Sequence, residues 1–290
     1  MSERALIFGA SGQVGLALQQ TASASVTIVA HDSRRTDVRD HAAIARAIDD
    51  AQPDLVVNCA AFTNVDRAEA EADDALAING VAAGCIAELA SAAGARLIHV
   101  STDYVFDGRA HRPYAPNAEV APINTYGATK LEGERRVLAS APQSVVVRTA
   151  WVHSGTGVNF IRTAVRMLTA GNVMRVVDDQ IGTPTRALHL AQAIWRISAR
   201  PHLQGVLHFT DAGVASWFDV AEVVHAVLKQ EGSLGAGASV VPRLTDEAPR
   251  PAARPHFSVM DKHASWEAIG FVPPHWRDGV IASTREALRS

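Results

Sequence analysis

The chain alternates short apolar runs with longer stretches in which apolar residues recur every three or four positions. The apolar runs are continuous and rich in β-branched residues, which predicts strands buried on both faces of a sheet, at residues 4–8, 26–30, 54–61, 96–102 and 144–152. Helical periodicity fills the intervals at residues 13–21, 37–52, 74–94 and from about 125 onward. This regular alternation predicts an α/β fold with a Rossmann-like, doubly wound parallel sheet.

Beyond Trp151 the alternation becomes less regular. The pattern predicts helices at 158–171, 183–198 and 216–230, strands at 173–179 and 205–211, and a loop with one short strand at 231–255. We therefore expect two domains. The first comprises residues 1–150 plus roughly 173–210, and a smaller C-terminal α/β domain comprises 151–172 and 211–290.

Composition narrows the class of protein. Of 290 residues, 48% are hydrophobic and 20% are charged, and we expect a soluble globular protein without a membrane span. Met1 is followed almost at once by the first apolar strand, without a signal-peptide pattern, so we expect a cytoplasmic location. The net charge of −3 argues against nucleic-acid binding.

The potential metal ligands show no binding motif. The twelve histidines and the carboxylates are scattered along the sequence, so we predict no metal site. The only cysteines are Cys59, in an apolar strand, and Cys85, in a helical stretch, and we expect both to be reduced thiols in the core.

A glycine-rich turn follows the first predicted strand and opens the first helix. Gly9, Gly12 and Gly15 have the spacing Gly-x-x-Gly-x-x-Gly. Glycine permits positive φ and lets the backbone approach a pyrophosphate, while a helix N-terminus offers free N–H groups and the positive end of a dipole. In the first βα turn of a βαβ pattern, this spacing predicts a dinucleotide site and makes the first domain the NAD(P)-binding one.

The second predicted strand ends with residues suited to an adenine ribose. Asp32 lies about 20 residues past the turn, where a carboxylate accepts hydrogen bonds from ribose hydroxyls. Arg34 and Arg35 follow it, and a guanidinium there pairs with a ribose 2′-phosphate. The sequence thus predicts NADPH or NADH as cofactor and leaves the choice between them open.

Tyr126 and Lys130 lie four residues apart at the start of a predicted helix, with Asn124 or Thr125 as a possible cap, and therefore share one helix face. A phenol is a poor acid near neutral pH, and a nearby ammonium lowers its pKa by stabilising the anion. Thr102 ends a buried strand and can hold a substrate oxygen by a hydrogen bond. These three residues predict the reduction of a carbonyl group.

Seven segments together resemble the dTDP-4-dehydrorhamnose reductase family of the extended short-chain dehydrogenase/reductases. They are "GASGQVG" (9–15), "DLVVNCAAFTNVDRAEAE" (54–71), "STDYVFDG" (101–108), "YGATKLEGE" (126–134), "RTAWVH" (148–153), "DDQIGTPT" (178–185) and "RPHFSVMD" (254–261). The resemblance implies that Tyr126 donates a proton to the C4 oxygen, with Thr102 and Lys130 also catalytic, and that Tyr126 and Lys130 contact the cofactor. It further implies cofactor contacts at Gln13, Val14, Asp32, Asp37, Val38, Ala61, Phe62 and Thr63.

The implied reaction delivers a hydride from NAD(P)H to the 4-keto group of a dTDP-6-deoxy-hexulose, within dTDP-rhamnose and cell-surface polysaccharide biosynthesis. The resemblance places Thr102, Asp103 and Trp151 against the substrate. Asn159 and Arg254 are further candidates for polar or diphosphate contacts.

Some members of the family dimerise through magnesium bound by glutamates in two helices. The matching helices here, "LALQQ" and "RALHLAQA", contain no glutamate. We therefore expect a monomer or a weak homodimer, with a dTDP-sugar as the partner molecule.

Two other functions remain open. A nucleotide-sugar epimerase or dehydratase would have the same fold, and Asp103 stands where a dehydratase needs an acidic residue. A non-catalytic cofactor-binding regulatory subunit is the second alternative. It has no need of Thr102, Tyr126 and Lys130 together, so a catalytic role is favoured.

Overall fold

The computed structural model describes residues 3–289, and its centre is a six-stranded parallel sheet. The strand order is β10-β5-β4-β3-β1-β2, which confirms the predicted Rossmann-like α/β fold. The strands span Glu3–Phe8 (β1), Val26–His31 (β2), Leu55–Asn58 (β3), Arg96–Thr102 (β4), Val145–Thr149 (β5) and Gly205–His208 (β10). The chain order reverses between β1 and β3, and ligands bind at such a switch point, beyond the carboxyl ends of the strands.

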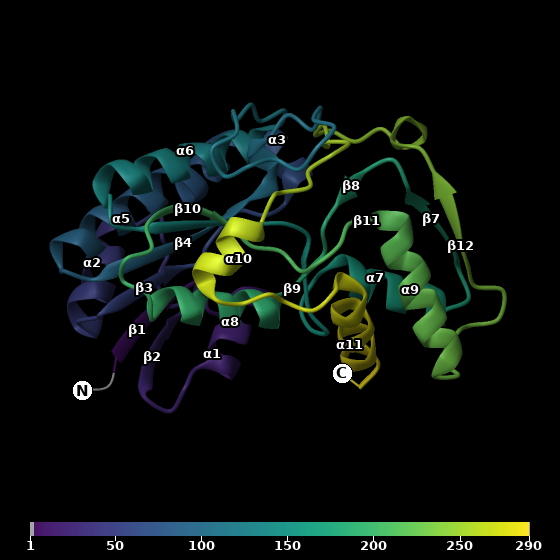
Figure 1. Ribbon diagram of the computed structural model, residues 1–290, viewed down its shortest axis with the longest axis horizontal. Coiled ribbons are helices and arrows are strands. Elements are labelled where there is room, and N and C mark those ends of the chain that lie inside the picture. Colours follow the sequence, from purple (N-terminus) through teal and green to yellow (C-terminus); the bar gives the residue numbers. More distant parts are fainter. Residues whose placement is uncertain (1–2, 290) are drawn as a thin grey trace.

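Helices cover both faces of this sheet (Figure 1). On one face lie α1 (Gln13–Thr21) and α8 (Ala187–Ser198), and on the other α2 (His41–Ala51), α5 (Ala82–Ala92) and α6 (Thr125–Ser140). Side chains alternate along β1, so Ala5 and Ile7 face α1 and α8 while Leu6 and Phe8 face the opposite core. Burial on both sides explains the continuous apolar runs.

Side-chain caps set several helix starts. The side chain of Asp40 accepts hydrogen bonds from the backbone N–H groups of Ala42 and Ala43, so α2 begins at His41 rather than at residue 37. The side chain of Asn124 accepts from the N–H of Gly127 and thereby caps α6. The predicted starting point of the Tyr126 helix is thus confirmed.

The helical stretch Ala72–Ala92 consists of α4 (Ala72–Leu76), a π-helical segment η1 (Ala77–Val81) and α5. By length and composition alone it is apolar enough to cross a membrane, although the sequence predicts no membrane span. Half of its apolar window is buried inside the protein, where α5 packs against α2 and α6. That burial is the behaviour of a core helix.

A second unit lies beside the sheet and has its own core (Figure 1). Here α7 (Phe160–Thr169), α9 (Trp217–Gln230) and α11 (Trp276–Arg289) pack with β7 (Val173–Val177) and β12 (Ser239–Arg243), which pair in parallel. The sequence pattern predicts that roughly residues 173–210 belong to the first domain. Within that range α8 and β10 do lie on the large sheet, whereas β7 pairs with β12 outside it.

The predicted strand 144–152 is interrupted near its end. β5 stops at Thr149, Trp151 has a positive φ of 49°, and β6 (Val152–His153) then pairs with β9 (Thr185–Arg186). Helix α8 therefore starts at Ala187 rather than at residue 183. The break turns the chain from the sheet into the second unit.

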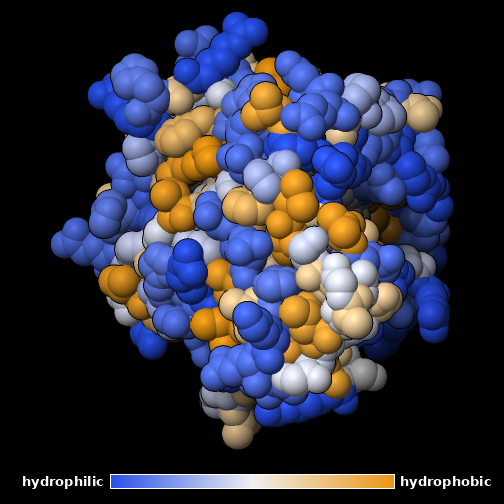
Figure 2. Space-filling view, turned by 90° about the vertical axis from the view of Figure 1, so that its right-hand side faces the viewer, coloured by the Kyte–Doolittle hydropathy of each residue, from blue (hydrophilic) through white to orange (hydrophobic). Residues whose placement is uncertain are grey.

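Several short elements were not predicted. They are α3 (Val65–Ala70), η2 (Asp103–Val105), β8 (Ile181–Gly182), β11 (Ala215–Ser216), η3 (Thr245–Glu247) and α10 (His263–Ile269). Figure 2 views the side of the second unit, where hydrophobic residues form small patches within a mainly hydrophilic surface.

Candidate active site

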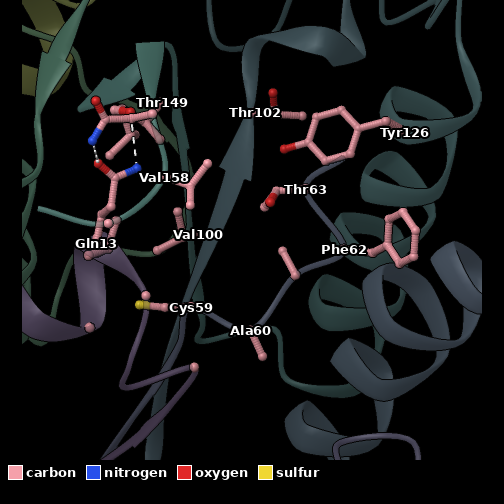
Figure 3. Close-up of a pocket in the computed structure, with 18 of the residues that line it drawn as sticks. Gln13, Cys59, Ala60, Phe62, Thr63, Val100, Thr102, Tyr126, Thr149 and Val158 are labelled. Atoms are coloured by element: carbon pink, nitrogen blue, oxygen red, sulfur yellow. Dashed lines mark hydrogen bonds between the residues drawn. The ribbon is translucent and has the colours of Figure 1, made fainter. Parts of the chain in front are cut away.

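A cavity of about 1030 Å³ lies beyond the carboxyl ends of β1, β3 and β4, at the switch point of the sheet. It also reaches the second unit through α7 and α9. Most of the residues predicted for the site line it: Gly9, Gly12, Gln13, Val14, Gly15, Asp32, Asp37, Val38, Ala61, Phe62, Thr63, Thr102, Asp103, Tyr126, Lys130, Trp151 and Asn159. The fold thus brings together residues from distant parts of the chain (Figure 3).

The glycine turn forms one wall of this cavity, and its geometry requires glycine. Gly9 has φ +76°, and a Cβ there would lie 2.6 Å from the nitrogen of Ala60. A Cβ on Gly15 would lie 2.5 Å from the carbonyl oxygen of Gly9. No side chain caps the start of α1 at Gly12, so among the described residues its first N–H groups are available to an anion. The turn therefore fits a pyrophosphate.

Gln13 ties this turn to the second unit. Its Oε1 accepts hydrogen bonds from Ser154 Oγ at 2.9 Å and from Asn159 Nδ2 at 2.8 Å. Figure 3 shows Gln13 on the wall opposite Tyr126. Asn159 also caps α7 by accepting from the N–H of Arg162. Its side chain therefore holds the wall of the cavity together.

The residues predicted to contact the adenine ribose lie near the end of β2, and Asp32 among them lines the same cavity. Asp32 Oδ1 accepts from the backbone N–H groups of Arg34 and Arg35, both at 3.1 Å, which fixes the turn after β2. Both arginines are exposed, and Arg34 is not among the residues that line the cavity. Asp37 is paired with Arg39, which also lines the cavity.

The segment after β3 is positioned by a residue that the sequence analysis missed. The side chain of Asn79, fully buried in the π-helical segment, accepts from the N–H of Phe62 and donates to the carbonyl oxygen of Phe62. Asn79 also donates to Thr129 Oγ1 on α6. An asparagine within an alanine-rich helix was the available signal.

Tyr126 and Thr102 meet inside the cavity. The Tyr126 hydroxyl points into the cavity near Thr102 (Figure 3), and the two side chains are close enough to interact by a hydrogen bond. Burial raises the pKa of Tyr126 to about 12, and the bond to Thr102 opposes this shift. Next to Thr102, burial raises the pKa of Asp103 to about 6, while hydrogen bonds from Ser258 and Thr102 oppose it. Tyr126 is therefore a protonated donor at neutral pH.

Lys130 is buried, and its Nζ donates to the carbonyl oxygen of Val100 at 2.7 Å. Burial lowers the pKa of Lys130 to about 8, and Glu134 and, after it, Cys59 oppose this shift. We had expected the lysine to lower the pKa of Tyr126. In the structure burial dominates, and the pKa of Tyr126 lies above its ordinary value.

Trp151 stacks on Trp217, with ring centroids 3.8 Å apart and planes inclined by 7°. Phe160 packs on Trp217, with ring centroids 4.7 Å apart. Gly182 lies against the Trp151 ring, since a Cβ there would be 2.6 Å from it. These rings lie where the first cavity adjoins a second one.

The second cavity, of about 900 Å³, adjoins the first at Phe160 and Trp217, which line both. Its apolar lining includes Met167 and Met174, and four arginines also line it: Arg175, Arg243, Arg250 and Arg254. Arg254, predicted as a substrate contact, lies here rather than in the first cavity. It forms a two-bond pair with Asp66 of α3, at 2.6 and 2.9 Å.

The sequence profile of the RmlD substrate binding domain family matches residues 3–288, almost the whole chain. The chain belongs to this family. It is 41% identical to the dTDP-4-dehydrorhamnose reductase of Mycolicibacterium smegmatis, over 97% of this chain and 84% of that protein. It is 38% identical to the dTDP-4-keto-6-deoxy-D-glucose reductase of Streptomyces niveus, over 95% of this chain and 94% of that protein.

A solved structure shares the fold throughout. The crystal structure of dTDP-4-dehydrorhamnose reductase from Bacillus anthracis, in complex with NADP, matches with a TM-score of 0.91 at 32% identity, covering 100% of both chains. The resemblance to the dTDP-4-dehydrorhamnose reductase family that the motifs suggested is therefore confirmed.

In this RmlD-family chain, the sequence predicted Trp151 but not the second cavity, nor Phe160 and Trp217 at its border. Trp217 is the first residue of α9, directly after Ser216, whose side chain and that of Asp219 form a capping box. A tryptophan at the first position of a predicted helix was the available signal.

Proposed function

We propose that this chain reduces the 4-keto group of dTDP-4-dehydro-6-deoxy-L-mannose with NADPH or NADH and so forms dTDP-L-rhamnose. The observation that supports this most directly is the cavity in which a phosphate-binding turn and the Tyr126–Thr102 pair face one another. Membership of the family and the names of the relatives support the choice of substrate.

The chain's own residues suit the cofactor and its chemistry. Gly9, Gly12 and Gly15 with the start of α1 would hold the pyrophosphate, and Asp32 the adenine ribose. When bound, NAD(P)H supplies the hydride that adds to the carbonyl carbon. Thr102 would hold the carbonyl oxygen by a hydrogen bond, and Tyr126 would give that oxygen its proton.

Other predicted residues would support this arrangement. Gln13, Val14, Asp37, Val38, Ala61, Phe62 and Thr63 would line the cofactor, and Lys130 would contact the nicotinamide ribose. Asp103 and Trp151 would contact the sugar, and Asn159 would keep the wall beside it in place.

The second cavity suits the nucleoside diphosphate of the substrate. Four arginines favour an anion, and aromatic and methionine side chains favour a flat base. Because Phe160 and Trp217 line both cavities, a substrate seated here can extend its sugar toward Tyr126.

We also propose a division of labour between the two units. Residues 1–150, with α8 and β10, would bind the cofactor, and the remaining C-terminal elements the substrate. The lack of glutamate in α1 and α8 supports a monomer or weak homodimer, and we propose that it acts in the cytoplasm.

A direct assay tests the function. Purified protein is mixed with NADPH or NADH and the dTDP-4-keto sugar, absorbance at 340 nm is followed, and the product is identified by NMR. We expect cofactor oxidation and dTDP-L-rhamnose. No oxidation would refute the proposal. In a parallel assay with dTDP-4-keto-6-deoxy-D-glucose, oxidation with that sugar alone would indicate the substrate named for the Streptomyces niveus relative instead.

The arginines after Asp32 provide a prediction about cofactor choice. Replacing Arg34 and Arg35 together by alanine should weaken NADPH binding by about 10-fold or more and change NADH binding little, since only NADPH has the 2′-phosphate. Fluorescence titration of both cofactors measures this. Arg46→Ala, in α2, is the matched control, and equal losses for both cofactors would exclude the role.

Arg254 provides a prediction about the substrate. Arg254→Ala should raise KM for the dTDP-sugar by about 10–100-fold, with a smaller change in kcat, because a charge-assisted hydrogen bond contributes about 1.5–3 kcal/mol. Calorimetric titration with dTDP should show the same loss. As a control, Asp66→Asn removes the charged partner of Arg254 and leaves the Arg254 guanidinium in place. Unchanged dTDP binding in Arg254→Ala would rule out the contact.

A further inference from the structure

His99 and Asn58 form a buried chain that ends at Lys130. They are register partners on β4 and β3, 0% and 1% exposed, and the mechanism proposed above uses neither. Nδ1 of His99 lies 3.1 Å from Asn58 Nδ2, and Nε2 of the same ring lies 3.3 Å from Lys130 Nζ. The titratable ring of His99 thus lies between the Asn58 amide and the Lys130 amino group.

The orientation of the Asn58 amide fixes where His99 carries its proton. The backbone N–H of Ala60 donates to Asn58 Oδ1 at 3.1 Å, so Nδ2 is the amide atom that faces His99. An NH₂ group only donates, and Nδ1 must therefore accept. Burial is the main cause that holds the pKa of His99 well below its usual value, so the ring is neutral. A neutral ring with Nδ1 unprotonated carries its proton on Nε2.

That proton points at Lys130. An ammonium group has three donors and no acceptor, so it would oppose the N–H of His99. A neutral amine can accept this N–H while it donates to Val100, whose oxygen is 2.7 Å away. The described contacts therefore fit the amine better than the ammonium.

We propose that His99, held as the Nε2–H tautomer by Asn58, is a positioning residue that disfavours the ammonium form of Lys130. This inference rests on the proposed function and gives the lysine a further task. In each reduction Tyr126 gives its proton to the substrate oxygen and becomes a phenolate. Lys130, on the same helix face, then returns a proton to it, and the resulting amine, held by His99, takes a new proton from solvent.

The other groups around Lys130 act in the opposite direction. Glu134, one turn further along α6, and Cys59, after β3, both favour the charged form. Tyr126 shares the helix face of the lysine, and β4 presents only His99 and the carbonyl oxygen of Val100 to Nζ. Replacing His99 leaves all the opposing groups in place.

The chain has only three lysines, Lys130, Lys229 and Lys262, which permits a direct measurement. Apoprotein labelled with ¹³C at the lysine ε carbon is titrated by NMR, and the Lys130 signal is assigned by its loss in Lys130→Met. In His99→Gln, whose side-chain oxygen can accept from an ammonium, the Lys130 midpoint should rise by about one pH unit, a tenfold change in its ionisation constant. Buried Lys262 and exposed Lys229 should not move.

A second variant separates the tautomer from simple loss of packing. Asn58→Ala leaves the ring in place and frees it to carry the proton on Nδ1, so the Lys130 midpoint should again rise. His208→Gln, at another buried histidine, should leave that midpoint unchanged. An unchanged or lower midpoint in His99→Gln would overturn the proposal, and so would a rise there without one in Asn58→Ala.

The titration uses no substrate, so its result stands whether or not the reductase assay succeeds. With active enzyme, the alkaline limb of kcat/KM should move upward in both variants, because the ammonium persists to higher pH. A merely structural role of His99 would lower activity without moving this limb.

Discussion

Tyr126→Phe should reduce turnover by about 10²–10⁴-fold, the contribution expected of a positioned proton donor. The change removes one oxygen and keeps the ring, which packs edge-on against Tyr104 with centroids 5.7 Å apart. Thr102 would remain to bind the carbonyl oxygen without supplying the proton. Initial rates at 340 nm measure the loss, and fluorescence titration should show cofactor binding within a few-fold of wild type.

The chain has only three tyrosines, and the other two provide matched controls. Tyr114 donates its hydroxyl to Asp107, outside both cavities, so Tyr114→Phe should keep its activity. Tyr104 lines the second cavity, and Tyr104→Phe should affect KM more than kcat. Turnover above about a tenth of wild type in Tyr126→Phe would show that another group donates the proton.

The sheet could be predicted from sequence because its strands are buried on both faces. Continuous apolar runs such as Leu55–Asn58 are stable in a strand that is buried on both faces. Capping residues such as Asp40 and Asn124 mark the helix starts. The second unit was harder to predict. Its strands are short and pair across long intervals, as β7 does with β12, so local periodicity does not show which sheet they join.

The site shows the same division. Gly9, Thr102, Tyr126 and Lys130 follow local rules about turns, strand ends and helix faces, and the fold places them around one cavity. Local rules do not reveal which side chains pair or pack with each other in the folded protein. The pairing of Arg254 with Asp66, from α3, and the stack of Trp151 on Trp217 depend on tertiary packing alone.

Glu134→Gln should lower the free energy of unfolding by about 3–5 kcal/mol, the usual effect of removing one partner from a buried ion pair. Glu134 and Arg148 have side chains 3% and 5% exposed, and they join at 2.7 and 2.9 Å. Ser101 also donates to Glu134, at 2.6 Å. The glutamine would leave the guanidinium of Arg148 buried without its counter-charge. Urea unfolding followed by circular dichroism measures the difference.

The same helix provides the control for this prediction. Glu132 pairs with Arg136, but the two side chains are 34% and 46% exposed, so Glu132→Gln should change stability by less than about 1 kcal/mol. Equal effects at the two positions would contradict the role of burial.

A double variant, Glu134→Leu with Arg148→Met, identifies the origin of the loss. Buried ion pairs replaced by apolar side chains of similar volume often keep or gain stability, because neither charge then needs a partner. If the double variant recovers most of the stability lost in Glu134→Gln, the unpaired charge of Arg148 is the cause. Because Glu134 also favours the ammonium of Lys130, the double variant should lower the Lys130 midpoint even where the fold is restored. Stability and the protonation of the site thus depend on the same carboxylate for different reasons.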